Sequence, residues 1–147
     1  MYKHLLVPTD GSKLSDKAVA QAIGLAKVTG ARLTALNVTP DYPQPLYMEG
    51  VLLNPVPRSE YAKHAKADAA KVLDRVLKKA AAAGVKCTPL HTIAGQPWEA
   101  IMAAAHKGKC DVIVMASHGR RGISALLLGS ETVKVLTHSK VPVLVVR

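Results

Sequence analysis

The sequence predicts an α/β fold with an open, five-stranded parallel sheet and helices on both of its faces. Two observations favour this fold. Short apolar runs alternate with amphipathic stretches of helical period along the whole chain. The run at 112–115 is continuously apolar, which is typical of a strand that is covered on both faces. When right-handed crossovers join these units, the strand order that we expect is 3-2-1-4-5.

The first unit contains a strand, a helix and a second strand. The strand at 5–7 stops at Pro8, and the hydroxyl of Ser12 can accept a hydrogen bond from the free N–H groups at a helix start. Gly30 ends that helix, because glycine readily adopts the left-handed conformation of a helix C-terminus. The second strand follows at 33–38.

The segment 40–57 has a different character. Its five prolines exclude a regular helix and a central strand. Long loops of this kind in compact domains are usually functional or mobile. The apolar residues between the prolines would let the segment cover a ligand, cover a partner subunit, or fold back on its own domain.

The alternation of strand and helix continues in the second half of the chain. Ser59 is expected to cap the longest helix and Gly84 to close it. Pro97 suits the first turn of a helix, where its missing N–H would have no partner. The elements expected here are helices at 59–84, 97–108 and 130–138 and strands at 85–93, 111–115 and 141–146.

Length and composition restrict the class of protein. A chain of 147 residues that is 49% hydrophobic suits one domain, 1–147, with a substantial core. No apolar run is long enough for a membrane span or a signal peptide, so we expect a cytoplasmic protein without a membrane partner. The two cysteines lack metal-ligand spacing and are expected to be buried free thiols.

The charge balance points to an anionic ligand. Twenty Lys and Arg residues stand against ten Asp and Glu residues, although many of the lysines fall on solvated helix faces. Aromatic residues, on which single-stranded nucleic acids stack, make up only 3% of the chain. A nucleic acid is therefore not the expected partner.

Two loops should lie together at the ligand-binding edge of the sheet. The carboxyl ends of the first and fourth strands flank the point where the strand order reverses, and ligands bind there in such sheets. The loop 8–12 contains Asp10, whose carboxylate can accept hydrogen bonds from a ribose hydroxyl or a base amino group. The loop 117–130 leads into a helix whose free N–H groups and dipole attract anions. Ser130 can cap that helix and offer its hydroxyl to a phosphate, so a phosphate-bearing ligand is expected.

The familiar catalytic and phosphate-binding motifs are missing from the sequence. Neither a Walker loop nor a G-x-G-x-x-G fingerprint occurs, and we find no nucleophile elbow and no zinc-ligand cluster. His118 is expected to pack or to donate a hydrogen bond rather than to catalyse, whereas Arg120 and Arg121 can pair with phosphates. We assign no catalytic residue, and any hydrolysis of a bound phosphate ester should be slow.

Four segments, in order along essentially the whole chain, resemble a known family. They are 6–12 (LVPTDGS), 115–119 (MASHG), 128–130 (LGS) and 141–146 (VPVLVV). Together they are similar to a single-domain universal stress protein. The resemblance implies a Rossmann-like fold of the adenine nucleotide alpha hydrolase type that binds ATP together with Mg²⁺ or Mn²⁺. It also implies a homodimer joined through the last strand, 142–146, whose apolar edge invites pairing.

ATP-binding members of that family carry the pattern G-x2-G-x9-G-(S/T). Gly119 and the pair Gly129-Ser130 match its second and third glycines, whereas Ala116 stands in place of the first. If this position needs only a small residue, nucleotide binding survives the change. If it needs a conformation that only glycine adopts easily, binding is weakened.

The resemblance also implies roles for individual residues. Pro8, Thr9 and Asp10 would meet the adenosine, and the backbone of Val38 would contact the adenine. The residues that would surround the ribose and the phosphates are Ala116, Ser117, His118, Gly119, Arg121, Gly129, Ser130, Glu131 and Thr132.

The resulting hypothesis is an ATP-binding, dimeric sensor or regulatory module of a stress response. One alternative is a dimeric interaction protein of the same family that binds no nucleotide, and Ala116 is its main support. A second is an enzyme of a related adenine-nucleotide fold, which would need a catalytic constellation that this sequence lacks. A third is a nucleic-acid binder, which only the positive charge favours.

Overall fold

The computed structural model describes residues 1–44, 47–52, 56–119 and 128–147. Its main sheet has the order β5-β2-β1-β6-β7, and every pairing in it is parallel. The strands of this sheet are β1 (His4–Pro8), β2 (Arg32–Thr39), β5 (Cys87–Ile93), β6 (Val112–Ala116) and β7 (Val143–Val146). The helices are α1 (Lys13–Thr29), α2 (Arg58–Ala82), α3 (Pro97–Gly108) and α4 (Ser130–His138). The expected order 3-2-1-4-5 is thereby confirmed.

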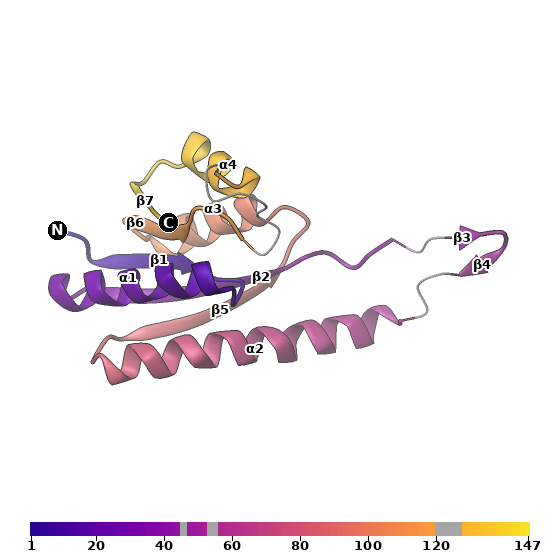
Figure 1. Ribbon diagram of the computed structural model, residues 1–147, viewed down its shortest axis with the longest axis horizontal. Helices are drawn as coiled ribbons and strands as arrows, with labels where there is room; N and C mark the ends of the chain where they lie inside the picture. Colours follow the sequence, from indigo (N-terminus) through magenta and orange to yellow (C-terminus); the bar gives the residue numbers. More distant parts are fainter. Residues whose placement is uncertain (45–46, 53–55, 120–127) are drawn as a thin grey trace.

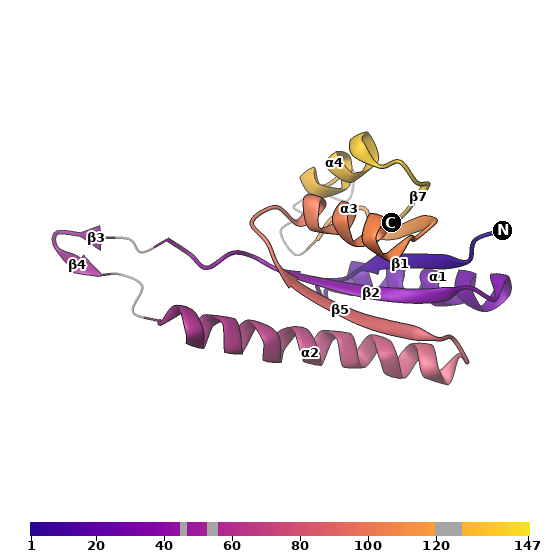
Figure 2. The ribbon, with the colours of Figure 1, turned by 180° about the vertical axis from the view of Figure 1, so that it is seen from behind.

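Two helices cover each face of the sheet (Figures 1 and 2), and each face has its own core. Side chains alternate between the two faces along a strand, as in β1, where Leu5 and Val7 face α1 and α2 and Leu6 faces α3 and α4. β6 is buried along its whole length because both faces are covered there. No helix in the described ranges is long and apolar enough to cross a membrane.

The helix ends agree with the sequence in some places and differ in others. Ser12 caps α1 by accepting a hydrogen bond from Ser15 N, and Gly30 ends it with φ +69°. Pro97 begins α3, as expected. Pro57, not Ser59, precedes α2, because its fixed φ of −60° already suits a helix start. Gly129 takes the cap position of α4, so Ser130 is the first helical residue rather than the cap.

The proline-rich segment forms a small hairpin away from the main sheet. Its strands are β3 (Tyr47–Met48) and β4 (Val51–Leu52), joined by Glu49 and Gly50 with φ of 51° and 79°. Two consecutive residues of positive φ are typical of a tight two-residue hairpin turn. The hairpin projects beyond the start of α2 (Figures 1 and 2) and does not fold back on the sheet.

Both cysteines are free thiols, as expected, but they differ in burial. Cys110 is buried beside His4, and burial raises the pKa of its thiol to about 11. Cys87 is only half-buried, at the start of the edge strand β5, and burial raises its thiol pKa as well. At neutral pH both thiols are protonated and unreactive.

Candidate functional site

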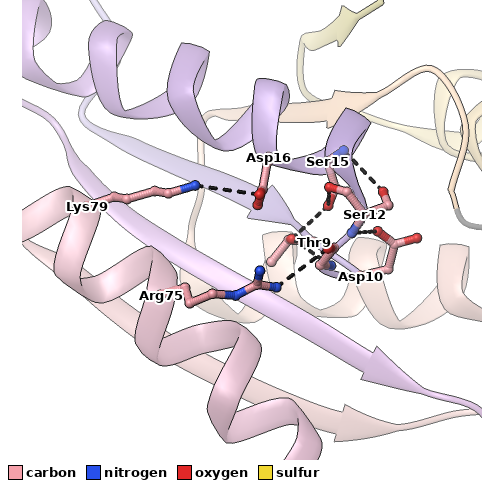
Figure 3. A network of polar contacts seen from close by, with 8 residues as sticks. Thr9, Asp10, Ser12, Ser15, Asp16, Arg75 and Lys79 are labelled. Carbon is pink, nitrogen blue, oxygen red and sulfur yellow. Dashed lines mark hydrogen bonds and ion pairs between the residues drawn. The ribbon is translucent and has the colours of Figure 1, made fainter.

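The loop after β1 is a compact hydrogen-bonded turn. Asp10 accepts a hydrogen bond from Ser12 N at 2.9 Å through its Oδ1 atom, and Gly11 N donates to the Thr9 hydroxyl at 3.2 Å. The buried hydroxyls of Thr9 and Ser15 lie 3.0 Å apart (Figure 3). Gly11 has φ +76°, a conformation that suits glycine. The side chain of Asp10 is thus fixed at the carboxyl end of β1.

Neighbouring elements hold this turn from outside. Asn37 of β2 donates a buried hydrogen bond to the Thr9 carbonyl at 2.9 Å. From α2, Arg75 reaches the Gly11 carbonyl at 3.5 Å, and Lys79 lies 3.6 Å from the Asp16 carboxylate of α1 (Figure 3). The last two contacts are at least partly exposed and contribute little individually.

The start of α4 is fastened to the end of β6. Gly129 N donates to the Ser117 carbonyl at 2.7 Å, and the buried Thr132 hydroxyl donates to the Ala116 carbonyl at 3.1 Å. A Cβ on Gly129 would lie 3.1 Å from both Cα and Cβ of His118. A side chain at this position would therefore have to displace His118 by a few tenths of an ångström, which favours glycine.

Ala116 has ordinary strand geometry. It is the last residue of β6, pairs with Val146 and is not among the described residues with positive φ. Alanine adopts such a conformation without strain. The departure from the family pattern at this position therefore adds one methyl group and imposes no conformational penalty.

A cavity of about 740 Å³ opens at the carboxyl ends of the strands, and a smaller one of about 200 Å³ adjoins it. Asp10, Val38, His118, Gly119, Glu131 and Thr132 line both cavities. Gly129 and Ser130 line the larger one, whereas Pro8, Thr9 and Ala116 line the smaller one. The structure thus brings together almost all the residues that the sequence suggested.

Two of the suggested residues are not among the described residues that line these cavities. Ser117 is buried, and its carbonyl accepts the hydrogen bond from Gly129 N, so it helps to position the start of α4. Arg121, with its neighbour Arg120, lies outside the described residues.

One wall of the larger cavity was missed by sequence reasoning. It comes from α2 and presents Tyr61, His64 and Asp68. None of these three residues was expected at the site from the sequence. No local motif marks this wall, because it faces the site only through the packing of α2 on β2 and β5.

Glu131 has a structural task in addition to its place at the cavity. Its Oε2 atom accepts a hydrogen bond from Trp98 N at 2.8 Å, so the carboxylate caps the first turn of α3. Its Oε1 atom lies 3.3 Å from Lys134 Nζ. Glu131 therefore links the starts of α3 and α4.

The described lining is acidic rather than basic. Its acidic residues are Asp10, Asp68 and Glu131, its histidines are His64 and His118, and Lys and Arg do not occur among the described lining residues. No cluster of three or more His, Cys, Asp or Glu suitable for a metal ion occurs in the described part of the chain. A divalent cation at this site would need ligands from a bound phosphate group.

A doubly wound parallel sheet with a cavity at its switch point defines an α/β protein of the adenine nucleotide alpha hydrolase-like fold. The sequence profile of the universal stress protein family matches residues 1–147. The chain is 34% identical over 152 residues to Universal stress protein MJ0531 of Methanocaldococcus jannaschii, covering all of this chain and 83% of that protein. The chain therefore belongs to the universal stress protein family.

Solved structures agree with this assignment. UspA of Lactobacillus plantarum superimposes with a TM-score of 0.83 at 27% identity, covering 99% of this chain and 98% of the other. A universal stress protein in complex with cAMP superimposes with a TM-score of 0.70 at 26% identity, covering 99% and 97%. That protein binds an adenine nucleotide on the same fold.

Proposed function

We propose that the chain is a cytoplasmic, dimeric regulatory module that binds an adenine nucleotide, with ATP accompanied by Mg²⁺ or Mn²⁺ as its ligand. The main support for this proposal is the cavity at the switch point, which both Asp10 and the start of α4 line. In this proposal the carboxylate of Asp10 accepts hydrogen bonds from the ribose, and the Val38 backbone contacts the adenine. The first N–H groups of α4, at Ser130, Glu131 and Thr132, bind the phosphates because a helix start leaves them without intrahelical partners.

A divalent cation would complete the charge balance of this site. Phosphate groups beside Asp10 and Glu131 would repel these carboxylates. Mg²⁺ prefers phosphate and carboxylate oxygens and keeps several of its waters, so it could bridge the nucleotide and the acidic wall. The net charge of +10 would also attract the anionic ligand to the molecule.

The second candidate function is a protein-interaction module without a nucleotide. The acidic character of the described lining favours it, because three carboxylates around one cavity repel the negative charges of a polyphosphate. It would use the same fold and the same dimer, so only binding measurements separate the two candidates.

The proposed dimer joins two copies of β7. β7 forms one edge of the main sheet, and its Leu144 is 43% exposed. An apolar edge strand with unpaired backbone groups favours pairing with a second strand. The two-fold arrangement of identical edges gives a closed dimer.

Titration with nucleotides tests the proposal directly. The protein is purified without nucleotide, and ATP with Mg²⁺, AMP, cAMP and GTP are titrated by calorimetry and by the fluorescence of Trp98, the only tryptophan in the chain. Pro97 lines the cavity beside it, so we expect bound nucleotide to change its emission. No binding of any adenine nucleotide up to millimolar concentration would overturn the proposal.

A matched pair of glycine variants tests the placement of the site. Gly129→Val should abolish binding because the side chain meets His118. Gly24→Val is the control, since a Cβ on this exposed glycine of α1 meets nothing within 4 Å. Equal ATP affinity of the two variants would show that the nucleotide does not bind at the start of α4.

A further inference from the structure

The hairpin of residues 47–52, here called the arm, lies outside the body that the main sheet and its helices form. It lies beyond the start of α2 and away from the main sheet (Figures 1 and 2). Met48 and Val51 pair across its two strands and are 65% and 60% exposed. A two-stranded hairpin is marginally stable alone in water, so this one needs a surface to pack on.

The base of the arm directs it away from its own sheet. The Tyr61 hydroxyl at the start of α2 donates to the Pro40 carbonyl at 2.7 Å, and the rings of Tyr42 and Tyr61 meet edge to face at 5.4 Å. Arg58 lies 5.4 Å above the Tyr42 ring, and the Tyr42 hydroxyl donates to the Val56 carbonyl. These contacts tie both ends of the segment to α2 and to each other, and the arm lies beyond them, away from the sheet.

The chain carries an uncovered surface of matching character at β5, the edge strand on the side of α2. The register pairs Leu90 of β5 with Leu36 of β2, which places Leu90 on the face that α3 covers. The main contacts of α3 with the sheet are with β1 and β2, and Leu90 is 40% exposed. β5 therefore offers an apolar side chain beside a backbone edge that has no further strand in the described sheet and lacks an N–H at Pro89.

Charge complementarity identifies the occupant as a second copy of this chain. The arm contains Glu49 and no Lys, Arg or His, whereas the whole chain has a net charge of +10. β5 is preceded by Lys86. Burial first, and then the charge of Lys66 on α2, lower the pKa of His91, which lies on the face of β5 opposite to Leu90. An acidic, apolar arm thus fits a basic, apolar edge of the same protein.

We propose that the arm of one subunit packs on the β5 edge of a second subunit, where Met48 and Val51 cover Leu90. A two-fold axis makes the exchange reciprocal, so each subunit gives one arm and receives one. The added strand would pair with the free backbone of β5, in the manner of strand addition to a sheet edge. This interface is separate from β7 at the opposite edge of the sheet.

Sedimentation analysis of three variants tests the proposal. We expect Met48→Asp with Val51→Asp, and separately Leu90→Asp, to halve the mass of the wild-type assembly. Val28→Asp is the matched control, because Val28 lies in α1 and is 84% exposed, and it should leave the mass unchanged. A wild-type mass that survives the arm substitutions overturns the proposal, as does a mass that falls with the arm variant but not with Leu90→Asp.

Disulfide trapping tests the contact itself. In a Cys87→Ser background, one sample carries Met48→Cys and a second carries Leu90→Cys. After mixing and mild oxidation, we expect a linked pair that contains one chain of each kind, and a reduced yield at high salt because the charge attraction is screened. Linkage only between identical chains, or the same yield for Val28→Cys in place of Leu90→Cys, overturns the proposal.

Discussion

The Oδ2 atom of Asp10 lies 2.9 Å from the point that a Cβ on Gly119 would occupy. These residues follow β1 and β6, so the contact joins the two strand ends between which the cavity opens. Gly119 is absent from the described glycines with positive φ, so a side chain here would be opposed only by the Asp10 carboxylate, which would have to shift. The relationship leads to the first prediction.

Gly119→Ala should weaken nucleotide binding without unfolding the protein. The new methyl group would displace the Asp10 carboxylate, and the loss of one charge-assisted hydrogen bond to the ribose corresponds to roughly tenfold or more in Kd. The carboxylate end can move, so the melting temperature should change little. Calorimetry and thermal melts separate the two effects, with Gly24→Ala as control. Unchanged ATP affinity would remove Asp10 from the binding site.

Ala116→Gly tests whether the missing family glycine matters. Because Ala116 has strand geometry without positive φ, we expect the ATP affinity to stay within a few-fold of the wild type. The added backbone freedom should lower the free energy of unfolding by about 0.5–1 kcal/mol. Urea titration and nucleotide titration measure the two quantities. A large gain in affinity would mean that the alanine methyl group obstructs the nucleotide.

Glu131→Gln should strengthen nucleotide binding. The amide oxygen can still accept the hydrogen bond from Trp98 N, which caps α3, while the negative charge beside the proposed phosphate position is removed. We expect several-fold tighter ATP binding at low Mg²⁺ and a smaller gain at high Mg²⁺, where the cation already offsets the charge. Glu131→Ala is the companion variant, and loss of the cap should cost about 1 kcal/mol of stability. Weaker binding by Glu131→Gln would assign the carboxylate a direct role in holding the ligand.

The sequence predicts the sheet order and most of the cavity because both follow from local rules. Apolar runs and helical patterns locate the strands and helices, and the switch-point rule then brings Asp10 to the start of α4. Position 131 shows where such rules end. Glu131 was assigned to the ligand, yet its carboxylate also caps α3 across the fold. The same holds for His64 and Asp68, since their place in the cavity depends on how α2 packs on the sheet.

The caps of α2 and α4 could not be chosen from sequence for a related reason. Ser59 and Ser130 are good capping residues, but Pro57 and Gly129 precede them and already have the extended backbone of a cap position. At Gly129 the close approach to His118 decides the outcome. That approach is a tertiary contact and leaves no signal in the local sequence.

Acidification should destabilise the protein through His4. Its ring is buried, with Nδ1 2.9 Å from the Gly108 carbonyl and Nε2 2.8 Å from the Thr34 hydroxyl. Burial, and then the charge of Arg32, lower the pKa of His4 below its ordinary 6.5. As the pH falls below about 6.5, His4 binds a proton in the unfolded chain but not yet in the folded protein. The free energy of unfolding therefore decreases until the pH reaches the lower pKa of the folded state.

Urea unfolding between about pH 8 and pH 5 measures this loss, whose slope for one proton is at most about 1.4 kcal/mol per pH unit. His4→Gln cannot be protonated, so its stability should change less with pH even if the variant is less stable overall. His106→Gln, at an exposed position of α3, is the matched control and should keep the slope of the wild type. If His4→Gln and the wild type lose stability with the same slope, the acid sensitivity belongs to other groups and the pKa of His4 is the same in the folded and unfolded states.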